Sequence, residues 1–361
     1  MPSTSNDKSG TRLPVSRETV TRATSRTLRR ARAAALALAA LLCLFLPLAT
    51  AQDGAPGGGG DAGAPANEDA ASEAEAGENR IITIDGSGGT QRGNLRFGPI
   101  IYEHPEPTGI KATVSTLTIL GSYAELAAPE GVSISRGGQR TARFQGGVEV
   151  ERGRLSASGP ELHYDEATGL GVLGQQAEIV VAPTDEADEP VYIDAAQVAF
   201  DVDTDRSTST GGVHLVNGNQ TADAQELIFE EEANLGVLTS AGSQAVITRL
   251  DEDGSTMTIT ADEIRVLTDA NKLYASGNVT VVDGSITSTG AIVFFDDETG
   301  IAEVVGSSSE PARSVDSDSG ATLVTDRIKQ DIEFDFFEAI DSSVPSDFDV
   351  TAFALRGEAQ E

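Results

Sequence analysis

Short runs in which apolar and polar residues alternate, separated by turns rich in Gly and Asp, fill most of this chain. The pattern is clearest from Gly277 to Gly306, where two alternating runs flank Asp283-Gly284 and a second turn follows at Asp296–Gly300. An Asp-Gly step supplies the positive φ of a tight hairpin turn, and the glycine that ends the second turn can adopt the left-handed conformation. This stretch therefore predicts three short antiparallel strands.

The same unit recurs along the chain. Acidic turns begin at Tyr164, Phe200, Phe229, Leu267 and Phe295, at separations of 36, 29, 38 and 28 residues, so that every second unit repeats at 65 to 67 residues. Glycine-led strands keep the same period. Because long and short spacings alternate, the sequence predicts a two-hairpin repeat rather than a single uniform rung.

The additional length of the long units lies in two polar segments, residues 183–190 and 251–255. Insertions in every second unit are expected to emerge at one edge of a stack of strands. Degenerate units are expected near residues 112–119 and 323–337. The predicted repeat domain then runs from residue 80 to residue 340.

Period-two alternation indicates which face of each strand is apolar. The residues predicted to point inward are Val148, Val150, Leu162, Tyr164, Val213, Leu215, Leu227, Phe229, Val279, Val281, Val293 and Phe295. Their sequence neighbours are mostly polar. Two such sheets packed face to face form a dry core, whereas two splayed sheets form an apolar trough, and the pattern alone leaves both open.

The two ends of the chain differ from this body. Residues 1–51 combine a basic leader with the uncharged run 33–51, which ends in a small-x-small pattern, and this layout predicts a cleaved signal peptide. An uncleaved membrane anchor is the alternative. Residues 52–79 are rich in Gly, Ala, Pro and acids, and predict a disordered tether. Residues 341–361 form a tail whose apolar stretch either adds an edge strand or blocks one.

Charge and cysteine content narrow the class of partner. The chain has 25 basic and 57 acidic residues; residues 1–51 hold eight and two of these, which leaves 17 and 55 and a net charge of −38. Such a charge argues against nucleic acid as a partner and favours solubility or divalent cations as intermediaries. The single cysteine, Cys43, lies in the leader, so the exported chain contains no disulfide.

Several motifs together resemble the OstA-like family, which includes the periplasmic lipopolysaccharide-transport protein LptA and the jellyroll parts of its partners. They are the Gly-x-Val-x-Val strand, the Ala-before-acid strands at Ala222-Asp223 and Ala261-Asp262, and the aromatic-acid-x-x-Thr-Gly turn. The resemblance covers roughly residues 110–335. It implies an all-β, repetitive antiparallel β-jellyroll with two facing sheets in an open or V-shaped arrangement.

The resemblance also implies a function. Family members hold lipid acyl chains in the apolar interior and join end to end through edge strands as a bridge across the periplasm. By position, the twelve inward residues would line the lipid path, and strands near 114–119 and 332–337 would be the docking edges. We therefore expect a non-catalytic protein of the periplasm or cell envelope that binds or conducts a lipid or glycolipid, without a cofactor. Lipopolysaccharide itself stays open, because a net charge of −38 repels a phosphorylated head group unless Ca²⁺ or Mg²⁺ intervenes.

Other classes of function find less support in the sequence. The exported part contains only His104, His163 and His214, without a positioned Ser or Cys partner, so we expect no catalytic site. The acidic loops 316–320 and 251–254 lack the full ligand set of a calcium loop, and solvated turns are the simpler interpretation. The alternative function is a structural β-repeat protein of the envelope or cell surface, with a closed core, that acts through its edge strands and acidic turns.

Overall fold

The chain folds into a stack of antiparallel strands. The computed structural model describes residues 79–184, 189–251, 254–331, 336–340 and 348–358. The strands are β1 (Thr83–Asp85), β2 (Thr90–Gly93), β3 (Ile100–Glu103), β4 (Ile110–Val114), β5 (Leu117–Gly121), β6 (Tyr123–Ala127), β7 (Thr141–Arg152), β8 (Leu155–Asp165), β9 (Leu170–Val181), β10 (Val191–Asp201), β11 (Arg206–Asn217), β12 (Gln220–Glu230), β13 (Leu235–Thr239), β14 (Ala245–Leu250), β15 (Thr256–Ala261), β16 (Glu263–Leu267), β17 (Lys272–Asp283), β18 (Ile286–Asp296), β19 (Ile301–Val305), β20 (Ala312–Asp316), β21 (Thr322–Thr325), β22 (Arg327–Asp331) and β23 (Phe336–Ile340). A 3-10 turn, η2 (Val350–Phe353), follows them.

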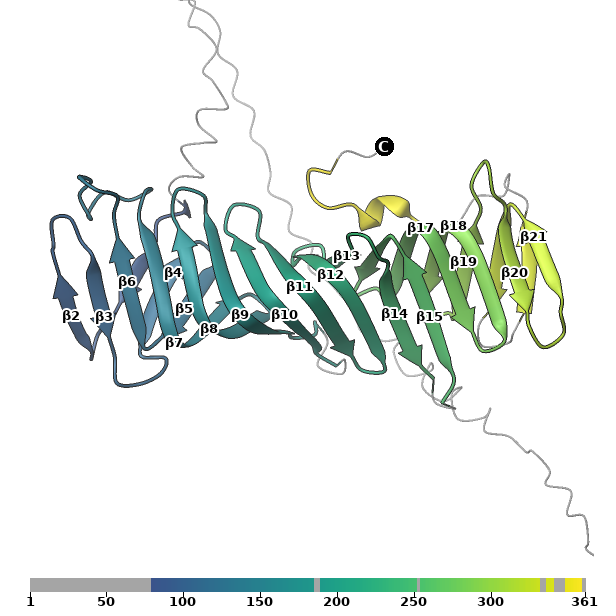
Figure 1. The fold of residues 1–361 in the computed structure, drawn as a ribbon, viewed down its shortest axis with the longest axis horizontal. Helices are drawn as coiled ribbons and strands as arrows, with labels where there is room; N and C mark the ends of the chain where they lie inside the picture. The colour runs from purple at the N-terminus through teal and green to yellow at the C-terminus, as the bar shows by residue number, and fades with distance from the viewer. Residues whose placement is uncertain (1–78, 185–188, 252–253, 332–335, 341–347, 359–361) are drawn as a thin grey trace, which may run out of the picture. The chain divides into compact units, whose positions relative to one another are not determined.

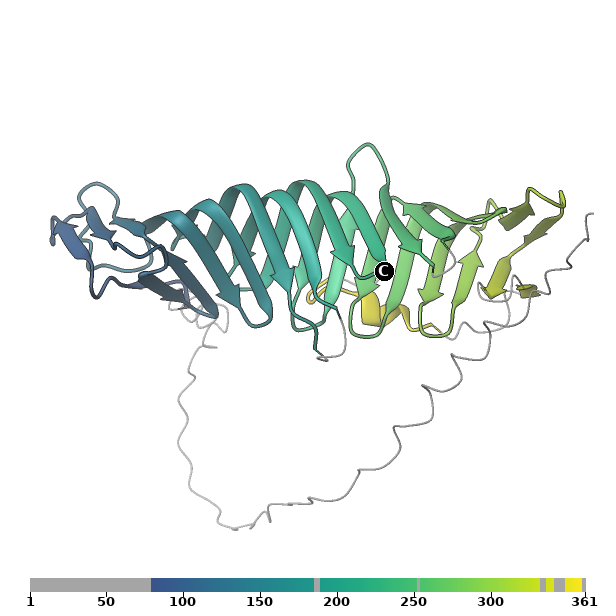
Figure 2. The ribbon, with the colours of Figure 1, turned by 90° about the horizontal axis from the view of Figure 1, so that it is seen from below.

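Figure 1 and Figure 2 show the strands side by side, largely in chain order. Every described pairing is antiparallel, as hairpins joined by short turns require. The predicted fold class, a repetitive antiparallel β-jellyroll, is confirmed. The expected signal peptide and all of the expected tether except Asn79 lie outside the described residues. No helix in the described ranges is long and apolar enough to span a membrane.

The long strands β7–β12, β17 and β18 each pass through an irregularity near the middle, where the pairing register shifts. At four of these places two consecutive residues have positive φ: 146–147, 175–176, 211–212 and 277–278. A bulge of this kind bends the strand and strengthens its twist. Each long strand therefore contributes one half to each of two facing layers.

We name these layers leaf A and leaf B. Leaf A contains β1, β4, β5, β14, β15, β20 and β21 together with one half of each long strand, and leaf B contains β2, β3, β6, β13, β16, β19, β22 and β23 with the other halves. In β7, for example, Thr141–Gln145 pairs with β6 in leaf B, whereas Glu149–Glu151 pairs with β5 in leaf A. The bulges form the line where the leaves meet.

This arrangement corrects the predicted strand lengths. The sequence pattern places the starts of the glycine-led strands at Gly147, Gly212 and Asn278. In the structure, these residues lie inside 12-residue strands. The physical reason is the pair of positive-φ residues, which interrupts the alternation without ending the strand. The three antiparallel strands predicted within Gly277–Gly306 are present as β17, β18 and β19.

The positions of the insertions and edges can also be compared with the prediction. The segments 183–190 and 251–255 connect β9 to β10 and β14 to β15, in both cases at the outer end of leaf A, as expected for one edge of the stack. The prediction of a docking edge near residues 114–119 is wrong. This segment belongs to β4 and β5, which are covered by β1 and β7, because strands β1–β3 extend the stack before it.

The described residues of the C-terminal tail, 348–358, neither add an edge strand nor block one. Residues 348–358 cross the outer face of leaf B, and Phe353 of η2 is buried against Leu235 and Val237 of β13. The apolar residues of the tail therefore cover a sheet face rather than a strand edge. Asp349 caps η2 by accepting a hydrogen bond from the backbone N–H of Thr351.

Candidate functional site

All twelve residues predicted to face inward point into the space between the leaves. Eleven of them are buried, and Leu215 is half-buried and packs against the same core. This core is one continuous hydrophobic cluster that extends from Ile82 to Ile328. The inner faces of leaf A and leaf B therefore meet along the stack, as the alternating pattern requires.

The first half of this interior is filled by large side chains. Phe144, Leu162, Tyr164 and Phe200 are at most 1 % exposed. The hydroxyl of Tyr164 donates a hydrogen bond to the carbonyl oxygen of Arg80 at 2.7 Å, and burial raises the pKa of this tyrosine. Between β7 and β10 the leaves therefore enclose a packed core and not an open trough.

A cavity interrupts the packing between β9 and β18. Its volume is about 100 Å³, and both leaves contribute apolar side chains to its wall. Those from leaf A include Val181, Ile193, Leu215, Ile247 and Ile259, and those from leaf B include Leu227, Phe229, Leu238, Val266 and Phe295. An apolar cavity with a small number of polar groups at its rim is the usual form of a binding site for an apolar ligand.

Four of the twelve predicted residues line this cavity, namely Leu215, Leu227, Phe229 and Phe295. The other eight pack in the hydrophobic core outside the cavity wall. Sequence reasoning missed the wall contributed by β13–β16, because the repeat units were aligned on their glycines and acidic turns. The signal was present: Thr256–Ala261 alternates strictly between polar and apolar residues, and its Met257 and Ile259 point into the cavity.

Charged residues close the cavity at the outer ends of the leaves. Nη1 of Arg249, in leaf A, lies 2.5 Å from Oδ1 of Asp297, which follows the leaf B half of β18. The side-chain amide of Gln220 donates to the other carboxylate oxygen at 3.2 Å. Burial raises the pKa of Asp297, while the Arg249 charge opposes this shift. The guanidinium carbon of Arg249 also lies 6.0 Å from the ring centroid of Phe295. The Arg249–Asp297 ion pair thus connects leaf A to leaf B at the cavity rim.

Polar side chains enter the interior beyond β18. The hydroxyl oxygens of Ser288 and Ser314 lie 2.5 Å apart, and the Ser288 hydroxyl donates to Oε1 of Gln330 at 3.2 Å. All three side chains are buried. The apolar cavity is therefore bounded by a packed apolar core on one side and by a buried hydrogen-bonded group on the other.

The remaining candidate chemistry lies outside this interior. His163 and His214 are exposed on their strands, where each pairs with one carboxylate, Glu161 at 2.6 Å and Asp223 at 2.8 Å. In the acidic loop after β20, hydrogen bonds from Ser319 and Ser285 lower the pKa of Asp316 to about 2. Within the described ranges, no group of three or more His, Cys, Asp or Glu residues is arranged to hold a metal ion.

The two-leaf architecture, with its cavity, is that of an antiparallel jellyroll. Comparison with known families gives a match over residues 192–301 to the model described as "LptA/(LptD N-terminal domain) LPS transport protein". This part of the chain, which includes most of the cavity wall, is similar to that family, and the resemblance to the OstA-like, LptA-type family is confirmed.

Among solved structures, the chain is similar to the crystal structure of LptH, the LptA homologous periplasmic component of the conserved lipopolysaccharide transport device from Pseudomonas aeruginosa. The two sequences are 13% identical, the TM-score is 0.31, and the match covers 35% of this chain and 87% of that one. Comparison with curated proteins gives no match.

Proposed function

We propose that this chain is a non-catalytic lipid-binding protein of the cell envelope, which holds an acyl chain of a lipid or glycolipid between its leaves. The observation that carries the proposal is the apolar cavity between β9 and β18, within the segment that matches the LptA-like family. An acyl chain placed there exchanges contact with water for contact with the apolar side chains of the cavity wall.

The twelve inward residues have two roles in this proposal. Leu215, Leu227, Phe229 and Phe295 contact the acyl chain directly, because they line the cavity. The other eight, which include Val148 and Val281, join the lipid path only when the leaves separate, since they pack against one another in the structure. A continuous conduit requires such separation along the whole stack, whereas a single-site carrier requires it only around the cavity.

The same resemblance supports a proposal for the partners and the location of this chain. We propose a periplasmic protein that docks to other jellyroll proteins of a lipid-transport bridge, or to copies of itself, by strand addition. The described strands available for this are β1, β2, β21 and β23, each of which pairs with only one neighbour in the structure. The net charge of −38 on residues 52–361 makes a divalent cation the natural intermediary between this chain and a phosphorylated head group.

Filling the cavity tests the proposal. Gly236 lies on the inner face of β13 and has no positive φ, and a Cβ there would lie 3.4 Å from Cδ1 of Leu227. Gly236→Leu therefore places a side chain inside the cavity. The matched control is Gly174→Leu in β9, where a Cβ meets no heavy atom within 4 Å and Gln197 is the partner on the neighbouring strand.

The measurement is lipid analysis of the exported protein after extraction from its native membrane. We expect bound lipid with the wild-type chain and with Gly174→Leu, and a loss of about tenfold with Gly236→Leu, whose melting temperature should not fall. Equal lipid content in both variants would show that the cavity is not the lipid-binding site.

A second function is favoured by the packed half of the interior. Between β4 and β10 the leaves close over a filled core, which is the arrangement of a structural β-repeat protein that acts through its edges and acidic turns. Reproducible absence of lipid from the wild-type chain favours this alternative.

A further inference from the structure

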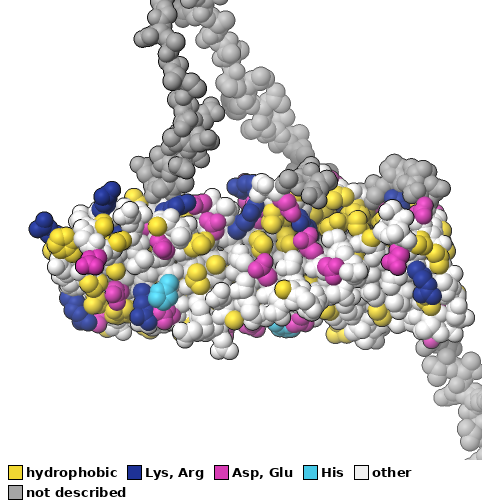
Figure 3. All heavy atoms as spheres, turned by 45° about the horizontal axis from the view of Figure 1, so that its top comes forward, with side chains coloured by type: hydrophobic (Ala, Val, Ile, Leu, Met, Phe, Trp, Pro, Cys, Tyr) yellow, Lys and Arg dark blue, Asp and Glu magenta, His cyan; other side chains and the backbone are white. Residues whose placement is uncertain are grey.

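The C-terminal segment 348–358 covers an apolar patch on the outer face of leaf B. We name the segment the strap. The outer patch consists of the outward-facing residues Ile228, Leu235, Val237, Leu267, Tyr274 and Phe294, from strands β12, β13 and β16–β18. Figure 3 shows hydrophobic side chains gathered in this part of the stack. Four of the five residues of β13 are buried. Those that face outward, Leu235 and Val237, are buried because the strap covers them.

Aromatic contacts attach the strap to the outer patch. Phe348 stacks on Phe294, with ring centroids 5.0 Å apart and an interplanar angle of 14°. Phe353 is 2 % exposed, and its ring centroid lies 5.8 Å from that of Tyr274. Removal of the strap therefore exposes several large apolar side chains to water at once.

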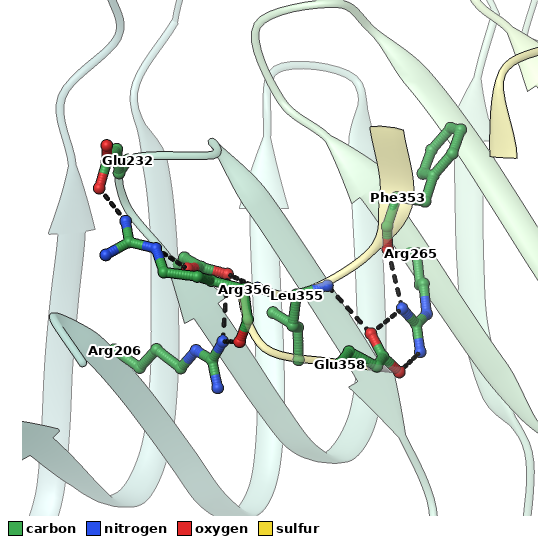
Figure 4. A network of polar contacts seen from close by, with 8 residues as sticks. Arg206, Glu232, Arg265, Phe353, Leu355, Arg356 and Glu358 are labelled. Carbon is green, nitrogen blue, oxygen red and sulfur yellow. Dashed lines mark hydrogen bonds and ion pairs between the residues drawn. The ribbon is translucent and has the colours of Figure 1, made fainter. Parts of the chain in front are cut away.

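Ion pairs fasten the strap at two places (Figure 4). The guanidinium of Arg265 in β16 donates to both carboxylate oxygens of Glu358, at 2.6 and 2.7 Å, and to the carbonyl oxygen of Phe353 at 2.8 Å. These hydrogen bonds lower the pKa of Glu358 to about 2. At the other place, the backbone N–H of Arg356 donates to Oε2 of Glu230 at 2.9 Å, and the Arg356 guanidinium pairs with Glu232.

The strap lies on the same strands whose inner faces form the leaf B wall of the cavity. Strands β12, β13, β16, β17 and β18 carry Leu227, Leu238, Val266, Leu273 and Phe295 on that wall. Two of these strands are short, because the long strands are interrupted here: β13 is separated from β14 by residues 240–244, and β16 from β15 by Asp262. This part of leaf B is therefore less constrained by leaf A than the part built from continuous strands.

The cavity is too small to hold a long acyl chain unless the leaf B wall moves. A cavity of about 150 Å³ holds one benzene molecule, and the cavity here, at about 100 Å³, is smaller. A long acyl chain enters only if the leaves move apart between β12 and β18. The strap binds the outer face of the moving wall across all of these strands and is attached to them in the closed form.

We propose that the strap restrains the opening of the cavity, so that strap release and acyl-chain binding favour each other. The inference rests on the proposed function. By thermodynamic linkage, if strap release strengthens lipid binding, lipid binding loosens the strap by the same factor. The loaded protein then exposes the outer patch, and the empty protein covers it.

The first test measures binding of dansyl-labelled undecanoic acid to the exported chain and to a variant that ends at residue 347. Strap removal is expected to strengthen binding on the order of fivefold or more. Glu358→Gln, which keeps the strap but weakens its pairing with Arg265, should give a smaller increase. Glu103→Gln is the control, because Glu103 pairs with Arg92 on an exposed strand far from the strap in sequence.

The second test follows the strap itself. The chain contains no tryptophan, so Phe348→Trp introduces a single fluorophore at a half-buried position on the outer patch. Addition of undecanoic acid should shift the emission to longer wavelength as the strap detaches. Undecanol, with the same chain length, should act in the same way, since the coupling depends on the volume inserted and not on the head group.

The outcomes separate the two proposals. If no variant binds the probe, the proposed function fails and the coupling fails with it. If the wild-type chain, the truncated chain and Glu358→Gln bind equally well, or the truncated chain binds more weakly while its circular dichroism stays that of a folded β protein, lipid binding stands and the coupling is overturned. If the truncated chain does not fold, Glu358→Gln and the tryptophan emission of the Phe348→Trp variant decide the question.

Discussion

At the scale of single residues, Glu166 is a buried charge held by several hydrogen bonds. Its side chain is completely buried, and its carboxylate accepts hydrogen bonds from the backbone N–H groups of Ile82, Gly138 and Arg140 at 2.8 to 3.0 Å. Nη2 of Arg140 lies 2.6 Å away. Burial alone would raise the pKa of Glu166, but the hydrogen bonds from Arg140 and from the backbone outweigh it and the pKa is lowered.

Glu166→Gln should lower the free energy of unfolding by about 3 kcal/mol at neutral pH, because it leaves the Arg140 charge half-buried without its partner. The pH dependence has a definite sign. A carboxyl whose folded pKa is depressed stabilises the fold above its ordinary value of 4.5, and this stability is lost as the pH falls below that value. The variant should therefore lose less stability on acidification than the wild-type chain does.

Urea unfolding at pH 7 and at pH 4 measures both effects. Glu103→Gln serves as the control, since Glu103 and Arg92 form an ion pair with both side chains largely exposed, and such pairs contribute about 0.5 kcal/mol. Equal losses in the two variants at neutral pH would contradict the role given to Glu166.

Sequence alone predicted part of this residue's environment. The turn at Tyr164–Gly169 was recognised from its acids and glycine, and Gly169 does have a positive φ. The burial of Glu166 was not predictable, because it depends on Ile82 and Arg140, which lie 84 and 26 positions away and come close only when the leaves form. A pattern within one repeat contains no information about such contacts.

At the scale of strands, the bulges decide how the repeat becomes two leaves. The alternation predicted the inward face of β7, β8, β11, β12, β17 and β18 correctly. A bulge of two positive-φ residues keeps inward residues on the same side: Ala275 and Val279 both point inward across Gly277 and Asn278. The bend itself was missed. A glycine before an alternating run has the same sequence signature whether it begins a strand or bends one.

Gly212→Ala tests the bulge in β11. A Cβ there meets no atom within 4 Å, but φ is +89°, so the cost is backbone strain alone, about 1 kcal/mol. Gly174→Ala is the matched control in β9, also without a close contact but without positive φ, and there alanine should be neutral or stabilising by about 0.5 kcal/mol. Thermal unfolding of both variants compares the two. A Gly212 variant as stable as the Gly174 variant would show that the bulge does not require the left-handed conformation.

At the scale of the whole stack, each strand contacts mainly its neighbours, as in other repeat proteins. Sequence period and family resemblance predicted this architecture and its twelve inward residues. They did not predict the cavity, whose position depends on how side chains of different size fill the space between β9 and β18. They also did not predict the strap, because Phe348–Leu355 alternates like a strand but meets a sheet face rather than an edge.

Nearest-neighbour stacking predicts a gradient of stability along the chain. Strand β2 is exposed at all four residues and pairs only with β3, and β21, exposed or half-buried throughout, pairs only with β20. Strands β8 and β9 pair on both edges and bury Leu155, Leu162 and Leu173 completely or nearly so. Since a terminal strand opens without breaking the interior, its amides should exchange hydrogen through local fluctuations. Hydrogen exchange followed by mass spectrometry should show exchange in β2 and β21 at least about a hundredfold faster than in β8 and β9. A uniform exchange rate along the stack would mean that the two leaves unfold as a single cooperative unit.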